Sequence, residues 1–200
     1  LKESISLKTR QRLYNYTTED IQEIITPMAQ HSKEAIGSMG SDTPLAVLSE
    51  KTQLIYNYFK QLFAQVTNPP LDGIREEIVT DISLSLGHDK NLFDISSRQC
   101  RKLKIQNPVI SNRDLHKIRQ IDSKGFKSRT IKILYNKSKG LNGIEDPLDR
   151  IINEVEGSID KGFNIIILSD KNANKTNAPI PALLACSFVH HSLNKRRKRS

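Results

Sequence analysis

The chain has 200 residues, a hydrophobic share of 36% and a formal net charge of +9, enough apolar material for one core or two small lobes. This composition excludes a disordered chain, and the longest apolar runs fall short of the roughly 20 residues that a membrane span needs. Two cysteines, with no Cys-x-x-Cys or His-Glu-x-x-His spacing, predict neither a disulfide framework nor a metal site. Because no Met precedes Leu1, we expect an interior piece of a longer polypeptide.

The first predicted helix begins at Thr17 or Thr18, either of which can cap it. Glu19 and Asp20 occupy its first turn, where the helix dipole favours acidic groups, and Pro27 is expected to bend or restart it. Apolar residues recur at helical spacing at positions 21, 24, 25 and 28.

A loop rich in glycine and serine, residues 37–44, leads to a second predicted helix that begins at Ser49 and ends at Pro69 and Pro70. This helix carries the widest apolar stripe of the chain, and core packing is its simplest explanation. No catalytic residue stands out between 37 and 77, so we interpret this segment as one that shapes a passage. The stripe consists of Leu54, Ile55, Tyr58, Phe59, Leu62, Phe63 and Val66.

Short elements follow, and then a longer strand, helix and strand. The run 163–168 is continuously apolar, which is typical of a strand covered on both faces. The predicted elements are a helix over 73–80, strands over 82–86 and 103–105, a helix opened by a capping box at Ser111 and Asp114, a strand over 126–135, a helix from Asp146 and Pro147 to Gly162, and a helix from Pro181.

These elements predict an α/β fold with an open sheet and flanking helices, preceded by a mostly helical N-terminal segment and truncated at the C-terminus. Residues 1–80 are predicted to be a helical linker and loop segment that packs on neighbouring domains. Residues 81–200 are predicted to be the α/β part, left incomplete.

Ser169 and Asp170 follow the apolar strand at the edge of the sheet where ligands usually bind, although a Ser-Asp turn after a strand is ordinary. The basic run Lys195–Arg199 suggests either a nucleic-acid arm or cations that favour the C-terminal end of a helix. His190 and His191 point about 100° apart on a helix, so they do not bind one metal easily.

Several ordered blocks resemble the central region of the large glutamate synthases. They are GSMGSDTPLAVLS at 37–49, YFKQLFAQVTNPP at 58–70, IREE at 74–77, IILSD at 166–170 and APIPALLA at 178–185, followed by His190-His191. The resemblance covers nearly the whole chain.

The resemblance implies a multidomain enzyme. An N-terminal glutaminase domain releases ammonia from glutamine, and a later FMN barrel with a 3Fe-4S cluster makes glutamate from 2-oxoglutarate. The central domain is implied to hold these two partners in fixed relation and to help wall the ammonia tunnel. By resemblance, Met39 is an adaptable plug of this tunnel, and the backbone of Thr67 and Asn68 forms a constriction.

The glutaminase nucleophile, the FMN site and the cluster cysteines are implied to lie in regions absent here, so no catalytic, cofactor-binding or metal residue is assigned. Members of the family take electrons from ferredoxin or from a nicotinamide nucleotide. Abundant Ile, Lys and Asn are typical of AT-rich genomes such as algal plastids, which favours ferredoxin and the plastid stroma, with a bacterial cytoplasm as the alternative.

Two readings of other classes stay open. The first is a free-standing basic nucleic-acid-binding module, although no aromatic platform or basic stripe completes one. The second is a small enzyme with Asp170 and His190 as an acid and base pair, which rests on spacing alone.

Overall fold

The computed structural model describes residues 6–33, 44–60, 63, 70–89, 91, 93–123, 125–140 and 143–199. The chain divides into two compact units, Leu1–Pro69 and Pro70–Ser200. The boundary predicted after residue 80 stays a prediction.

The N-terminal unit is helical along much of its described length. It contains α1 (Leu7–Leu13), the π-helix η1 (Asp20–Ile25) and α2 (Thr26–His31). The predicted cap at Thr17 is confirmed, because the Asp20 N–H donates to Thr17 Oγ1 at 3.0 Å and the Thr17 N–H donates to Asp20 Oδ2 at 2.8 Å. Pro27 lies in the first turn of α2, where its missing N–H costs nothing.

The helix predicted from Ser49 is wrong over the described residues. Ala46–Leu48 (η2) and Ile55–Phe59 (η3) are short 3-10 helices, and Lys60 is extended. Aromatic and β-branched residues have modest helix propensity, and an amphipathic helix depends on packing of its apolar face. Here Tyr58 is 50% exposed and Phe59 73%, so that packing is missing. Leu62 and Val66 lie outside the described residues.

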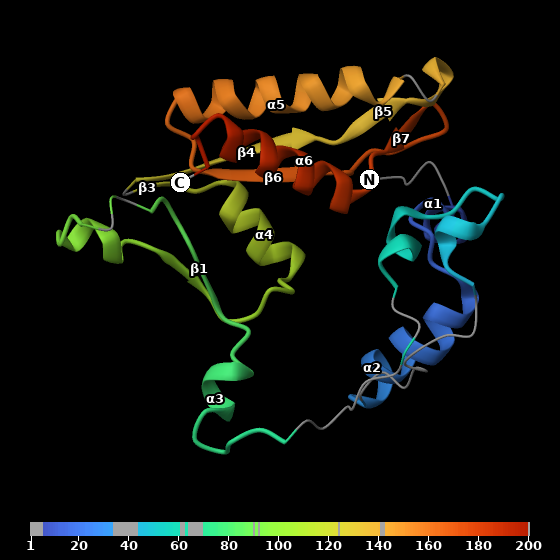
Figure 1. Cartoon of the computed structure of the whole chain (residues 1–200), viewed down its shortest axis with the longest axis horizontal. Coiled ribbons are helices and arrows are strands. Elements are labelled where there is room, and N and C mark those ends of the chain that lie inside the picture. The colour runs from blue at the N-terminus through green and yellow to red at the C-terminus, as the bar shows by residue number, and fades with distance from the viewer. Residues whose placement is uncertain are drawn as a thin grey trace. The chain divides into compact units, whose positions relative to one another are not determined.

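The C-terminal unit contains the predicted succession of strand, helix and strand, and the structure shows that the two strands pair in parallel. Strands β4 (Phe126–Lys132) and β6 (Ile165–Ser169) run parallel with Ile131 opposite Leu168, and α5 (Glu145–Asp160) connects them (Figure 1). The short strand β3 (Asp122–Ser123) pairs antiparallel with the other edge of β4. The order β3-β4-β6 places β6 at an edge of the described sheet, and the predicted α/β class is confirmed.

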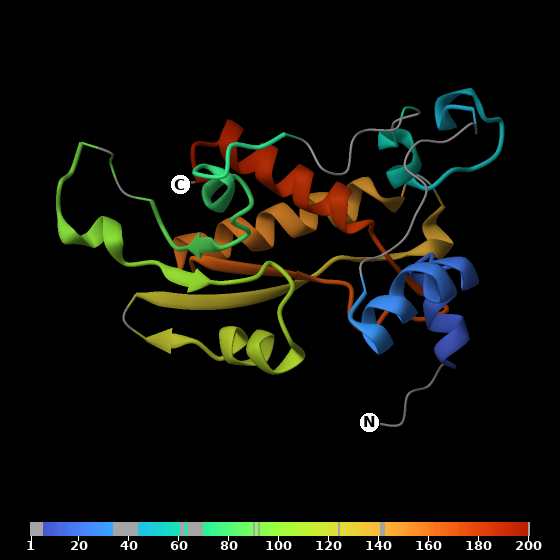
Figure 2. The same ribbon diagram turned by 90° about the horizontal axis from the view of Figure 1, so that it is seen from below.

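The core lies between this sheet and two helices, α5 and α6 (Ala182–Lys195). Both views place these helices together on one face of β4 and β6, and α4 (Asn112–Arg119) lies across the opposite face (Figures 1 and 2). The buried core consists of Ile131, Ile133, Leu148, Ile151, Ile152, Val155, Ile180, Ala185, Val189 and Leu193.

The strand predicted over 126–135 is interrupted at Ile133. Its N–H donates to the Ser169 carbonyl at 2.9 Å, and its carbonyl accepts from the Ile180 N–H at 2.8 Å. Beyond this point β5 (Leu134–Asn136) pairs antiparallel with β7 (Asn177–Pro179). Ile133 is therefore the residue at which the chain changes its hydrogen-bonding partner.

Helix α5 ends as predicted and begins two residues early. Its N-cap is Ile144, so Asp146 lies in the first turn instead of capping the helix. At the other end Gly162 adopts φ +83°, its N–H donates to the Ile159 carbonyl at 2.8 Å, and the Phe163 N–H donates to the Ser158 carbonyl at 3.0 Å. These two bonds form a Schellman motif.

The remaining predicted elements of this unit are present, but the helix predicted over 73–80 and the strand predicted over 82–86 are shorter than predicted. A short helix, α3 (Glu76–Val79), precedes an antiparallel pair of strands, β1 (Leu84–Leu86) and β2 (Leu103–Ile105). The short helix η4 (Ser97–Cys100) lies between these strands. None of the helices in the described part of the chain has the length and apolar character of a membrane span.

Candidate functional site

The predicted tunnel residues Met39, Thr67 and Asn68 lie outside the described residues. Their roles stay predictions. The described part of their unit, residues 6–33, 44–60 and 63, contains no buried residue, and it exposes large apolar residues such as Val47, Leu48 and Phe59.

The carboxyl end of β6 is a compact turn. Ser169 is buried, its Oγ accepts from the Lys171 N–H at 3.3 Å, and the Asp170 carbonyl accepts from the Ala173 N–H at 3.3 Å. The Ser169 hydroxyl is thus used in the turn, which favours the ordinary structural interpretation over a ligand site.

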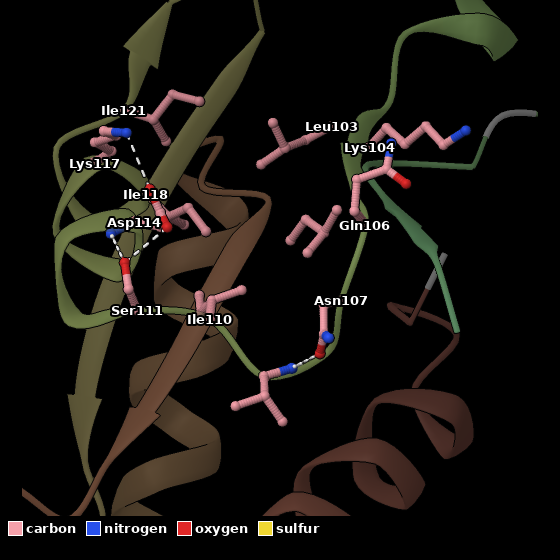
Figure 3. Close-up of a pocket in the computed structure, with 12 residues that line it drawn as sticks. Leu103, Lys104, Gln106, Asn107, Ile110, Ser111, Asp114, Lys117, Ile118 and Ile121 are labelled. Atoms are coloured by element: carbon pink, nitrogen blue, oxygen red, sulfur yellow. Dashed lines mark hydrogen bonds and ion pairs between the residues drawn. The ribbon is translucent and has the colours of Figure 1, made fainter. Parts of the chain in front are cut away.

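A cavity of about 450 Å³ lies between β2, the segment that follows it, and α4 (Figure 3). Apolar side chains make up most of its wall: Leu103 and Ile105 come from β2, and Ile118 and Ile121 from α4 and its end. Asp114 and Lys117 lie in its lining and form an ion pair at 3.0 Å. The cavity was not predicted from the sequence. Its two apolar faces do have a sequence signal, because apolar residues alternate at 103 and 105 and recur three residues apart at 118 and 121.

The acidic group in this cavity is held in its charged form. The pKa of Asp114 is lowered first by the hydrogen bond from the Ser111 hydroxyl, at 2.7 Å, and then by Lys117. A carboxyl with a lowered pKa is a poor general acid at neutral pH. Among the described residues, the cavity lining contains no histidine or cysteine, and apolar atoms make up most of its surface.

Three other carboxyls in the described residues have a lowered pKa for similar local reasons. Hydrogen bonds from the backbone and side chain of Thr17 lower the pKa of Asp20, and those of Ser83 lower the pKa of Asp81. The hydrogen bond from the Lys102 side chain is the main cause of the lowered pKa of Asp89. The Asp20 carboxylate thus holds a helix start and the Asp81 carboxylate a turn, whereas the Asp89 carboxylate pairs with Lys102, which is 13 residues away.

The basic C-terminal run folds back onto α5. Lys198 Nζ forms an ion pair with Asp160 at 2.9 Å, and Arg196 forms one with Glu156. Arg199 Nε donates to His190 Nδ1 at 3.2 Å. The C-terminal ends of α5 and α6 therefore lie together, and cations gather where two helix dipoles and two carboxylates concentrate negative charge.

This arrangement favours the helix-end interpretation of the basic run over a nucleic-acid arm. It also gives His190 two partners, Arg199 and Asn194, the latter at 2.9 Å, so the proposed pairing of His190 with Asp170 gains nothing from the structure. Cys100 and Cys186 are both free and exposed. Among the described residues, no three His, Cys, Asp or Glu side chains cluster as metal ligands do.

The fold and these surfaces define an α/β domain with an apolar cavity, locally neutralised charges and an N-terminal unit that exposes apolar residues. The chain matches the family model of the glutamate synthase central domain over residues 9–200. It belongs to this family, and the match gives no support to the nucleic-acid-binding alternative.

Curated relatives include glutamate synthases of three kinds. The chain is 42% identical over 194 residues to the glutamate synthase [NADPH] large chain of Bacillus subtilis, which covers 97% of the chain and 12% of the relative. It is 39% identical over 189 residues to the glutamate synthase [NADH] of Schizosaccharomyces pombe, covering 94% and 9%. It is 40% identical over 194 residues to the ferredoxin-dependent glutamate synthase of Cyanidium caldarium, covering 95% and 12%.

The chain thus spans about a tenth of the length of these relatives. Their names include both ferredoxin and nicotinamide nucleotides, so the identity values do not select an electron donor.

Proposed function

We propose that this chain is the central scaffold of a glutamate synthase that makes L-glutamate from L-glutamine and 2-oxoglutarate. In this proposal it holds a glutaminase domain and an FMN-barrel domain of the same polypeptide in fixed relation and helps to wall an ammonia tunnel between them. The observation that carries the proposal is the family match over 9–200. The exposed apolar residues of the N-terminal unit support it, because a segment without its own buried core gains stability by packing on neighbouring domains.

A tunnel serves this reaction for a simple chemical reason. Ammonia released into water at neutral pH becomes ammonium, which is not nucleophilic, and it diffuses away. A closed passage excludes bulk water and so prevents this loss. The residues that wall such a passage need shape and apolar character, and they need no acid–base groups.

We place Met39 in this passage as an adaptable plug, with the Thr67 and Asn68 backbone as a constriction. In the full-length enzyme, Met39→Trp is expected to uncouple glutamine hydrolysis from glutamate formation, because the bulky ring blocks transfer while both catalytic centres stay intact. Parallel assays of glutamine consumption and glutamate production measure the ratio of the two rates.

Ser187→Trp is the control, because Ser187 is exposed inside α6 in the other unit and lies outside the apolar surface that is proposed to pack on neighbouring domains. It is expected to keep the two rates coupled. Matched, unchanged rates in the Met39→Trp enzyme would contradict the tunnel assignment.

The cofactors of the whole enzyme are proposed to lie outside this chain. A three-iron cluster is held by cysteine thiolates, and this chain has only two cysteines, on η4 and on α6. Its residues therefore do not fit the cluster, and we assign both the 3Fe-4S cluster and FMN to the barrel domain.

Ferredoxin is the electron donor that we favour, and NADPH is the alternative. The abundance of Ile, Lys and Asn suggests an AT-rich genome, and a ferredoxin-dependent enzyme in the plastid stroma fits such a genome. A bacterial cytoplasm is the alternative location. Assays of the full-length enzyme with reduced ferredoxin and with NADPH test the preference directly.

A further inference from the structure

Two large apolar side chains stand exposed in the segment between β1 and β2. The Phe93 side chain is 93% exposed and the Ile95 side chain 101%. A single exposed apolar residue on a protein surface is ordinary, but two so fully exposed and so close in sequence are not. The described residues of this segment, 87–89, 91 and 93–102, are here called the β1–β2 loop, and they project away from the three-stranded sheet in both views (Figures 1 and 2). Two nearly complete exposures within three residues suggest an unfilled contact.

The base of the β1–β2 loop is closed by one lysine. Lys102 Nζ donates to the Gly87 carbonyl at 3.4 Å and to the His88 carbonyl at 3.2 Å, and it forms an ion pair with Asp89. The two ends of the loop are thereby held together, and the span between them is restricted.

The tip of the loop is held by polar side chains around the apolar pair. The Phe93 N–H donates to Asn91 Oδ1 at 3.1 Å, and the Ser96 N–H donates to Asp94 Oδ1 at 3.0 Å. The Gln99 amide donates to the carbonyls of Asn91, at 2.5 Å, and Asp94, at 3.3 Å. These bonds hold the described residues on the C-terminal side of Phe93 and tie Phe93 itself to Asn91, which lowers the cost of ordering this part of the loop on binding.

We propose that Phe93 and Ile95 form an anchor that inserts into an apolar pocket on another domain of the same polypeptide. The inference rests on the proposed function, in which this chain is one segment of a full-length glutamate synthase. An aromatic and an aliphatic side chain on a preorganised loop have the chemistry of a contact that carries much of an interface's energy.

The pocket that receives Phe93 and Ile95 could belong to the same polypeptide or to a second copy of the chain, and the length of the relatives favours the same polypeptide. This chain spans about a tenth of each relative, so in the proposed full-length enzyme most of the polypeptide lies outside these 200 residues. A pocket tethered on the same polypeptide meets the loop at an effective concentration on the order of millimolar, well above that of a separate copy in dilute solution.

Crosslinking tests the anchor in the full-length protein. Benzoylphenylalanine in place of Phe93 is expected, on irradiation, to join position 93 to a residue outside these 200 residues in the same polypeptide. Mass spectrometry identifies the joined peptides. A crosslink to a second copy overturns the proposal, and so does a free, solvent-quenched probe.

The same probe in place of Ile78 is the matched control, because Ile78 is 79% exposed on α3 of the same unit and lies outside both the β1–β2 loop and the cavity lining. A much lower crosslink yield is expected there, and an equal yield overturns the assignment of the anchor to this loop.

Amide hydrogen exchange is the second test. The double variant Phe93→Ser/Ile95→Ser is expected to raise the exchange rate of residues 93–102 by roughly tenfold or more in the full-length protein, because loss of the anchor contact lets the loop open locally. Unchanged exchange overturns the proposal.

The two hypotheses fail in different ways. An enzyme that makes glutamate from glutamine but shows no crosslink from position 93 overturns the anchor alone. A full-length protein that shows no glutamate synthesis with any donor overturns the proposed function.

Discussion

Gly157 and Gly162 lie five positions apart in and after α5, and their replacement by alanine is expected to have opposite effects. Gly157 is inside the helix, and a Cβ there would meet nothing within 4 Å. Gly157→Ala should therefore stabilise the chain by about 0.5–1 kcal/mol through helix propensity. Urea denaturation followed by circular dichroism measures the free energy of unfolding, and a loss of stability would contradict the expected sign.

At Gly162 the backbone conformation decides the outcome. Its φ of +83° is unfavourable for any side chain, although the space around it is open. Gly162→Ala is expected to destabilise the chain by about 1 kcal/mol, whereas Gly162→Asn should cost less because asparagine tolerates this conformation. The same urea denaturation applies, and equal costs for the two variants would argue against the backbone explanation.

At the scale of elements, α4 depends on its cap. The Asp114 N–H donates to Ser111 Oγ at 3.1 Å, which satisfies one of the free N–H groups of the first turn. Ser111→Ala is expected to reduce the free energy of unfolding by about 1 kcal/mol. Ser187→Ala, at an exposed position inside α6, is the control and should change stability little or raise it slightly. If both variants behaved alike, the cap would not be the cause.

Elements with strong local signals could be predicted from the sequence. The cap at Thr17, the Schellman glycine at 162 and the apolar run of β6 each depend on residues close in sequence. The break at Ile133 could not be predicted, because it depends on bonds to Ser169 and Ile180, which are far away in the chain.

The candidate site follows the same division. The apolar alternation of β2 and the spacing along α4 were visible in the sequence, but only their tertiary placement creates the cavity between them. In the segment from Ser49 the sequence pattern was misleading. Its helical spacing predicts a long helix, but such a helix needs a packing surface, and the described residues form only a short 3-10 helix. The tunnel residues were inferred by resemblance alone and stay predictions.

At the scale of the whole molecule, acid is expected to destabilise the fold. Asp20, Asp81, Asp89 and Asp114 all have a folded-state pKa lowered from 3.8, so the unfolded chain binds more protons in this range. Their contribution is complete above pH about 4 and is lost as pH falls through the lowered values.

Chemical denaturation at a series of pH values from about 6 to about 2 measures this dependence as the free energy of unfolding. The contribution of these four groups to the free energy of unfolding is expected to be constant near neutral pH and to fall below pH about 4. Asp89→Asn should reduce the slope, because the charge paired with Lys102 is removed. A stability that rises on acidification would contradict this prediction.

The position of β6 at the margin of the described sheet has a practical consequence for handling the protein. Ile165, Ile166, Ile167 and Leu168 form a short run of high β-propensity with no charge or proline, and β4 pairs with only one side of it. Such a run can recruit the same run from another molecule into a growing fibre. Concentrated stocks of the separate 200-residue chain are therefore expected to precipitate, and Ile167→Lys is expected to reduce this precipitation.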